Sequence, residues 1–219
     1  MAALLDIHTV FFTVLGYPMS YLEFFGTLLN VWAVWLMTNK RLATWPVGLV
    51  ATVLFAYLFF QIRMYSDFLE QGYYFATNCW GWWLWTRKPS SGENAPLRVS
   101  FNSARTNAVL AAGIAGGTLA LGWASSHLHV WLPAWFPEAA SFAYLDAFTT
   151  AMSFVAQLLG AYQKMENWPL WMLVNLLSAW MYWQRGVLFV AVLFLAFFVL
   201  AVKGWLSWQK LRDPSLPAR

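Results

Sequence analysis

The chain repeats itself at a fixed offset of 123 residues, without a gap. Trp45-Pro46 recurs as Trp168-Pro169, and Gly81-Trp82 recurs as Gly204-Trp205. Many small and apolar positions between these landmarks also coincide, and each copy runs from an acidic residue to an ending of the form Gly-Trp-x-x-Trp-x-basic. A repeat of this length indicates two copies of one structural unit, which any proposed fold must accommodate.

Composition places these copies in a membrane. Of the 219 residues, 61% are hydrophobic and only 10% are charged, which is too apolar for the surface of a soluble protein. The 16 tryptophans and nine tyrosines favour membrane–water interfaces. The net charge of +4 fits loop asymmetry better than nucleic-acid binding, and Cys79, the single cysteine, excludes an internal disulfide framework. No Lys or Arg precedes the first apolar stretch, so we expect no cleaved signal peptide.

Seven stretches are long and apolar enough to cross a bilayer. They are residues 21–38, 45–62, 67–86, 105–124, 143–161, 168–184 and 187–208. Each repeat takes three spans, and 105–124 lies between them. Four crossings restore the starting direction, so the repeats are expected to be parallel. The sequence therefore predicts an all-α integral membrane protein with a 3+1+3 arrangement, typical of a transporter whose site lies between two similar halves.

The segments between the spans set the expected organisation and orientation. We expect an interfacial segment at 1–20, with a helix within 1–18, a first repeat at 21–87, a cytoplasmic linker at 88–104, a linking helix at 105–124, an outer loop at 125–142, a second repeat at 143–210 and a cytoplasmic tail at 211–219. With the N-terminus outside, every Lys and Arg except Arg63 and Arg185 falls inside. This bias predicts N-out, C-in.

Signals for metal or enzymatic chemistry are missing from the sequence. His8, His127 and His129 fall outside the predicted spans, so haem and buried zinc are not expected. No phosphate-binding loop, Ser/His/Asp set or catalytic dyad is present. We therefore expect no cofactor and no enzyme. The predicted spans also hold almost no charge at mid-depth, which favours facilitated diffusion over proton coupling and leaves sodium coupling through neutral oxygens open.

Polar residues recur at helical spacing within three spans. Asp67, Gln71, Tyr74 and Asn78 share one face of the third span. The same spacing groups Asn175, Ser178 and Tyr182 on the sixth span, and Ser153 with Gln157 on the fifth. Such residues can bond helices to one another, but three stripes at similar depth favour a polar cavity. The candidate substrate-binding residues are Gln71, Asn78, Asn175, Gln157, Tyr74, Ser178, Trp168, Trp180, Tyr182 and Phe55.

Aromatic residues accompany these stripes, and some of them are candidates for gates. The candidate gating or structural residues are Trp45, Pro46, Phe59, Pro169, Trp183 and Asp67. Proline in a first helical turn fixes how the chain enters each helix. A pocket of rings and amides suits a flat, polar, ring-bearing solute and can attract a delocalised cation. Because no Arg or Lys is available at mid-depth, a phosphorylated ligand should be rejected.

The order and doubling of several motifs also resemble a known family. The motifs are Asn39…Trp45-Pro46-x-Gly48, Tyr57…Phe60, Tyr65-x-Asp67, Gln71 and Gly81-Trp82-Trp83-x-Trp85, then Asn167-Trp168-Pro169-x-Trp171, Asn175, Ser178, Tyr182, Gly186-x-Leu188 and Gly204-Trp205. Over residues 21–210 the chain resembles the PnuC family of nicotinamide riboside transporters, which is similar in fold to the SWEET carriers.

The resemblance implies uptake of nicotinamide riboside, an NAD precursor, by facilitated diffusion through the bacterial inner membrane. It also implies trapping of the substrate by a cytosolic nicotinamide riboside kinase, and a homotrimer in the bilayer. Judged from the residues alone, thiamine or a nucleoside other than nicotinamide riboside also fits the pocket as a substrate. The same residues disfavour a SWEET-type sugar carrier. The internal repeat is not exact. Gln71 and Asp67 of the first copy align with Phe194 and Val190 of the second copy.

Overall fold

The computed structural model describes residues 6–7, 9–14, 16–61, 65–87, 98–134 and 139–212. This part of the chain holds seven helices: α1 (Tyr21–Thr38), α2 (Thr44–Gln61), α3 (Tyr65–Thr86), α4 (Ala104–Trp131), α5 (Ala143–Ala161), α6 (Asn167–Gln184) and α7 (Leu188–Leu211). The seven predicted helices are confirmed. The one large difference is α4, which continues to Trp131 instead of ending near 124, and so includes His127 and His129.

A short hairpin precedes the helices, where we had expected an interfacial helix. Strand β1 (Val10–Val14) pairs antiparallel with β2 (Tyr17–Ser20). The run of β-branched and aromatic residues in β1 favours an extended strand. Gly16 lies in the turn with φ of +80°, a conformation that glycine adopts without steric cost. These two features explain why this segment folds back on itself.

The hairpin is tied to two helices from opposite ends of the chain. Ser20 caps α1, because its Oγ accepts from Glu23 N at 3.2 Å while its own N donates to Glu23 Oε2 at 2.8 Å. The Tyr17 hydroxyl donates to Glu23 Oε1 at 2.5 Å, and its ring stacks on Phe189 in α7 with centroids 5.9 Å apart. Burial, together with the neighbouring Glu23 carboxylate, raises the pKa of Tyr17 above its usual range. The hairpin thus joins the start of α1 to the start of α7.

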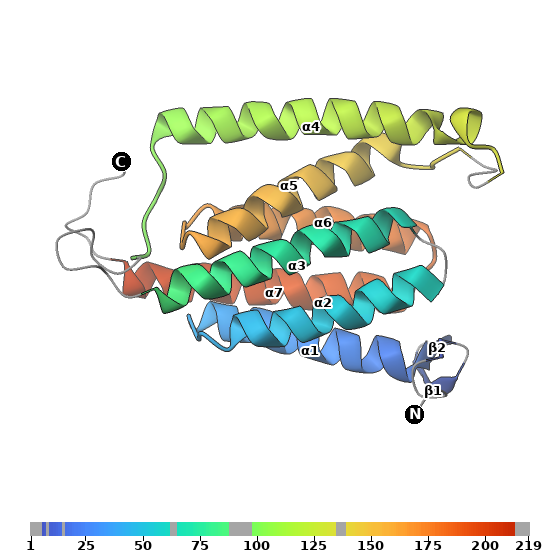
Figure 1. Cartoon of the computed structure of the whole chain (residues 1–219), viewed down its shortest axis with the longest axis horizontal. Coiled ribbons are helices and arrows are strands. Elements are labelled where there is room, and N and C mark those ends of the chain that lie inside the picture. Colours follow the sequence, from blue (N-terminus) through green and yellow to red (C-terminus); the bar gives the residue numbers. More distant parts are fainter. Residues whose placement is uncertain are drawn as a thin grey trace.

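Six of the helices form a closed ring, and α4 lies outside it. Each helix of the ring packs on the next in the order α1, α2, α3, α5, α6, α7 and back to α1. The contacts α3–α5 and α7–α1 are the two seams between the halves of the chain. Helix α4 packs on α5 along the outside (Figure 1). By length and apolar composition, α2, α4 and α7 could each cross a membrane within the described ranges.

One end of the ring is built around tryptophans, and the 123-residue offset relates its packing in the two halves. Trp45 contacts Gly81 and meets Trp85 edge-on, with centroids 5.2 Å apart and an interplanar angle of 86°. In the second half, Trp168 contacts Gly204 and meets Trp208 at 5.2 Å and 90°. We call this the tryptophan end, defined by Trp45, Trp85, Trp168 and Trp208.

Two hydrogen bonds cross the seams at the tryptophan end. Trp85 Nε1 donates to the Ala161 carbonyl at 2.9 Å, joining α3 to the end of α5. Trp208 Nε1 donates to the Met37 carbonyl at 3.0 Å, joining α7 to the end of α1. Each half therefore bonds the other through the last tryptophan of its Gly-Trp-x-x-Trp motif.

A segment before α4 covers the tryptophan end of the second half. Met165 N donates to the Ser100 carbonyl at 2.9 Å, and Ser100 N donates to the Gln163 carbonyl at 3.3 Å. Val99 is buried against Met165, Trp168 and Trp208. Residues 98–103 therefore form an ordered strap at the end of the expected linker, whose earlier part, 88–97, lies outside the described residues.

Candidate functional site

A cavity of about 410 Å³ lies inside the ring. All six ring helices contribute to its wall, and α4 does not. Its polar and charged lining residues are Asn30, Thr44, Thr52, Asp67, Glu70, Gln71, Tyr74, Asn78, Asp146, Thr149, Thr150, Ser153, Gln157, Asn167, Asn175, Ser178 and Tyr182. Its aromatic lining residues are Trp45, Phe55, Phe59, Trp168, Trp171, Phe194 and Phe197. A concave site of this size with rings and convergent polar groups is the usual form of a small-molecule site.

One wall of the cavity is a hydrogen-bonded set of side chains that crosses a seam. Asn78 of α3 donates through Nδ2 to Thr52 Oγ1 of α2 at 3.3 Å. Its Oδ1 accepts from Gln157 Nε2 of α5 at 3.5 Å. Thr52 in turn donates to the Gly48 carbonyl at 2.8 Å. Asn78 therefore joins the two halves while facing the cavity.

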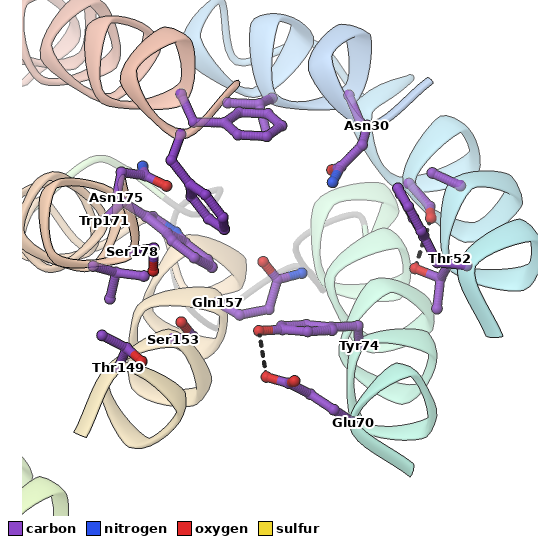
Figure 2. Close-up of a pocket in the computed structure, with 18 of the residues that line it drawn as sticks. Asn30, Thr52, Glu70, Tyr74, Thr149, Ser153, Gln157, Trp171, Asn175 and Ser178 are labelled. Carbon is purple, nitrogen blue, oxygen red and sulfur yellow. Dashed lines mark hydrogen bonds between the residues drawn. The ribbon is translucent and has the colours of Figure 1, made fainter. Parts of the chain in front are cut away.

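The opposite wall carries polar groups that lack protein partners. Asn175 and Ser178 of α6 are each 5% exposed, and neither side chain forms a hydrogen bond within the described part of the chain. Figure 2 shows both residues on the cavity wall beside Trp171, with Ser153 and Gln157 on the neighbouring helix. Buried polar groups in folded proteins almost always find a partner. These two groups are therefore free to bond a ligand.

The end of the cavity opposite the tryptophan end is lined by carboxylates. Asp67 and Glu70 come from the first turns of α3, and Asp146 comes from the first turn of α5. We call this the acidic end. Asp146 pairs with Arg185 at 2.9 Å, while Glu70 Oε1 accepts from the Tyr74 hydroxyl at 3.1 Å. Among the described lining residues there is no Lys, Arg or His. The wall of the cavity is therefore acidic.

The two ends of the cavity differ in exposure. At the tryptophan end, the lining residues Trp45 and Trp168 are each 1% exposed. At the acidic end, the side chain of the lining residue Asp146 is 43% exposed. The cavity is thus covered at the tryptophan end and meets exposed residues at the acidic end.

Most of the residues selected from the sequence line this cavity. They are Gln71, Asn78, Asn175, Gln157, Tyr74, Ser178, Trp168, Tyr182 and Phe55, together with Trp45, Phe59 and Asp67. Pro46 and Pro169 are not in the lining, and each lies in the first turn of its helix beside a lining tryptophan. Their roles in substrate binding stay predictions.

The structure does not bring Trp180 and Trp183 to the cavity. They are 48% and 63% exposed, on the face of α6 that also carries the exposed residues Leu173 and Leu176. Positions three and four apart share a helix face, so this stripe points away from the face of Asn175. Trp180 instead packs edge-on against Phe142. Trp171 lies four residues before Asn175 and so shares its helix face, whereas Trp180 lies five residues after it and does not. This spacing distinguishes the rings in the sequence.

Several lining residues were absent from the sequence-based selection. The main ones are Asn30, Thr52, Glu70, Thr149, Asn167 and Trp171, whereas Ser153 lies in one of the polar stripes that the sequence predicts. Trp171 precedes Asn175 by one helical turn, and Glu70 precedes Tyr74 by one turn, so spacing alone could have included both. Thr52 carried no such signal, because a threonine in an apolar helix usually bonds its own backbone.

An apolar ring of helices around a polar cavity defines a helical membrane transporter. The family model described as "Nicotinamide mononucleotide transporter" matches residues 20–210, and the chain belongs to this family. The chain is 27% identical to the nicotinamide riboside transporter PnuC of Escherichia coli (strain K12), over 88% of this chain and 87% of that one. It is 25% identical to the nicotinamide riboside transporter PnuC of Neisseria mucosa, over 89% and 74%.

Two further similarities extend the comparison. The riboflavin/roseoflavin transporter RibM of Streptomyces davaonensis is 22% identical over 84% of this chain and 82% of its own length. A crystal structure of the vitamin B3 transporter PnuC superposes with a TM-score of 0.63 at 20% identity, covering 87% of this chain and 81% of that one. The structural match supports the helical fold. The named relatives are transporters and not enzymes.

Proposed function

We propose that this chain takes up nicotinamide riboside by facilitated diffusion through the central cavity. The observation that carries this proposal is the combination of the family with the lining: rings, amides and hydroxyls, and an acidic wall. Nicotinamide riboside is a flat pyridinium cation with a carboxamide and a ribose. Rings attract a delocalised cation, amides pair with the carboxamide and hydroxyls pair with the sugar.

The free groups of α6 are the proposed anchors of the ligand. Asn175 and Ser178 would bond the carboxamide or the ribose, with Gln71 and Gln157 from the facing helices completing the set. The rings of Trp171, Trp168 or Phe55 would stack on the pyridinium. Asn78 has a different role, since its side chain already bonds Thr52 and Gln157.

The charge of the cavity favours the riboside over its phosphorylated form. The family description names the mononucleotide, whereas the Escherichia coli and Neisseria relatives are named for the riboside. A phosphate would enter among Asp67, Glu70 and Asp146 with no described Lys or Arg in the lining to pair with it. Burying an unpaired charge beside like charges is unfavourable. We therefore propose that the mononucleotide is excluded.

For the architecture, we propose two parallel three-helix repeats joined by α4, with the N-terminus outside. The matched packing of Trp45 on Gly81 and of Trp168 on Gly204 supports equivalent halves. The basic residues at the tryptophan end, among them Lys40, Arg41, Arg87, Lys164 and Lys210, favour placing this end on the cytoplasmic side. The segment boundaries expected from the sequence follow the same scheme.

For the mechanism, we propose alternating access with the described state facing outward. The buried Trp45 and Trp168 and the two seam hydrogen bonds of Trp85 and Trp208 would close the cytoplasmic side. Rocking of the halves would break these bonds and close the acidic end around Phe59 and Tyr182. The family resemblance further supports a bacterial inner-membrane homotrimer that works with a cytosolic nicotinamide riboside kinase.

Transport by the purified protein in liposomes tests this proposal. With inward proton and sodium gradients imposed and the membrane potential held at zero by valinomycin and equal potassium, labelled nicotinamide riboside should enter until its internal and external concentrations are equal. Accumulation above the external concentration under these conditions, or loss of uptake when the proton or sodium gradient is removed, would exclude facilitated diffusion. Absence of any uptake beyond that of protein-free liposomes would remove the proposed substrate.

A flavin is the second candidate substrate, favoured by the Streptomyces relative named for riboflavin and roseoflavin. Riboflavin is also flat and rich in hydrogen-bonding groups, but its ring system is neutral. Labelled riboflavin in the same liposomes would distinguish the two candidates, and thiamine serves as a cationic comparison. We expect uptake of nicotinamide riboside and not of riboflavin.

A further inference from the structure

We infer that Glu70, oriented by Tyr74, lets the cavity distinguish a cationic ring from a neutral ring of the same shape. This inference rests on the proposed function, because it concerns the charge that the same cavity selects. It assigns a specificity-determining role to a residue that the repeat does not duplicate, since position 193 of the second half is a leucine.

Glu70 lies in the wall of the cavity, and an uncharged partner holds it in place. Its Oε1 accepts one hydrogen bond, from the Tyr74 hydroxyl at 3.1 Å. Figure 2 shows this pair on α3, facing the helix that carries Ser153 and Gln157. A phenol donates a proton to a hydrogen bond but carries no positive charge. The bond therefore orients the Glu70 carboxyl group without supplying a counter-charge, so a cationic ligand can act as its charge partner.

The other charged groups at the acidic end divide into paired and unpaired. Asp146 is bonded to Arg185 at 2.9 Å, so this pair has no net charge. Arg185 also lies over the rings of Phe142 and Tyr182. Asp67 forms no ion pair among the described residues, and it lies one helical turn closer to the start of α3 than Glu70. Glu70 is thus the unpaired carboxylate nearer the free amide and hydroxyl of α6.

A ligand bound to α6 would meet this charge. Asn175 and Ser178 are 5% exposed and lack protein partners in the described chain, which independently points to a ligand between α6 and α3. These neutral groups bond a carboxamide or a sugar equally well whether the attached ring is charged or neutral. Groups that attract positive charge separate the two cases, and the lining offers two kinds: aromatic rings and a carboxylate without an ion-pair partner. Glu70 supplies the carboxylate.

Oxidised and reduced nicotinamide riboside offer a direct comparison. The oxidised form carries a pyridinium cation, while the reduced form has a neutral dihydropyridine with the same carboxamide and ribose. Calorimetric titration of the purified full chain with each form should show at least tenfold tighter binding of the oxidised form. Glu70→Gln should weaken binding of the oxidised form at least tenfold and change that of the reduced form less than about threefold.

Two further variants separate charge from structure. Tyr74→Phe retains the Glu70 carboxylate but removes the hydrogen bond that orients it. The preference for the oxidised over the reduced form should therefore be smaller than in the wild-type chain but still present. Glu166→Gln alters a carboxylate at the tryptophan end that bonds Asn102 N at 2.7 Å and does not line the cavity, and the preference should stay at the wild-type value. Melting temperatures of all variants identify any loss of folding.

The outcomes distinguish this inference from the proposed function. Equal affinity of the wild-type chain for both forms would overturn the role of charge, whether or not Glu70→Gln folds. An undiminished preference in folded Glu70→Gln would also overturn it, and the proposed function would stand. Failure of the wild-type chain to bind either form would instead reject nicotinamide riboside as the substrate.

Discussion

The indole ring of Trp45 occupies the space that a side chain at Gly81 would need. A Cβ on Gly81 would collide with three carbon atoms of that ring, and a Cβ on Gly204 would collide with the ring of Trp168 in the same way. The two tryptophans close one end of the cavity, so the bare backbone of each glycine lets the ring pack directly on the helix. This close approach explains why the Gly-Trp motif accompanies the Trp-Pro motif in both halves.

Gly81→Ala should therefore destabilise the protein. The added methyl group cannot be accommodated without displacing Trp45, and overpacking of this kind costs about 1–3 kcal/mol. Thermal unfolding of the detergent-purified protein should give a lower melting temperature, and Gly204→Ala should behave alike. Gly72→Ala is the matched control on the same helix, because nothing lies within 4 Å of its Cβ position. A melting temperature for Gly81→Ala equal to that of Gly72→Ala would contradict the packing.

Removal of the seam hydrogen bonds should favour opening of the tryptophan end. Trp85→Phe and Trp208→Phe keep a ring but lose the donors to the carbonyls of Ala161 and Met37. Each such bond contributes about 1 kcal/mol, so opening should increase about fivefold per substitution. A cysteine at the buried lining position Ala201, in a Cys79→Ser background, reports the change by its rate of labelling from the side of the membrane that the tryptophan end faces.

Trp82→Phe is the control for this experiment, because Trp82 is exposed on the same helix as Trp85 and its indole has no hydrogen bond in the described chain. Its labelling rate should equal that of the reporter protein alone. Equal rates in all three variants would mean that the seam bonds do not hold this end closed.

The helices follow from sequence more readily than the site does. The bounds Tyr21–Thr38 and Ala143–Ala161 coincide with the predicted spans, because continuous apolar stretches in these lengths favour transmembrane helices. The hairpin at Val10–Ser20 could not be recognised in that way. It depends on the turn at Gly16 and on contacts with distant Phe189, whereas its aromatic residues also fit an interfacial helix.

Asn175 and Asn78 should respond differently to alanine, although both line the cavity. Asn175→Ala removes a group with no protein partner in the described chain, so nicotinamide riboside affinity should fall at least tenfold while the melting temperature stays within about 2 °C of wild type. Asn78→Ala breaks bonds to Thr52 and Gln157, so both affinity and melting temperature should fall. Titration and thermal unfolding of each variant measure these effects. A large loss of stability in Asn175→Ala would refute its assignment as a ligand group.

Trp171 and Trp180 lie on different faces of α6, and replacing each in turn tests which ring stacks on the substrate. Trp171 lines the cavity, whereas Trp180 lies on the outer face against Phe142. Trp171→Ala should weaken riboside binding at least tenfold, and Trp180→Ala should leave the dissociation constant within about twofold of wild type. The reverse order of effects in the same titration would place the ligand elsewhere.

The site could be predicted in part, since polar residues at helical spacing mark a helix face. This is why Gln71, Tyr74 and Asn78 were found together. Spacing within one helix does not reveal which face meets the neighbouring helices, so the sequence offers Trp180 as a binding residue and Trp183 as a gate, although both are exposed in the structure. The pairing of Asp146 with Arg185 also required the structure, because it decides which carboxylate of the cavity has an ion-pair partner.

Calorimetric titration of the purified wild-type chain with nicotinamide riboside and with its mononucleotide tests the central claim most directly. An acidic cavity with unpartnered amide and hydroxyl groups should bind the riboside and give no measurable heat with the mononucleotide at the same concentrations. Binding of the mononucleotide as tight as that of the riboside would contradict the account, because the described lining contains no positive group to receive a phosphate.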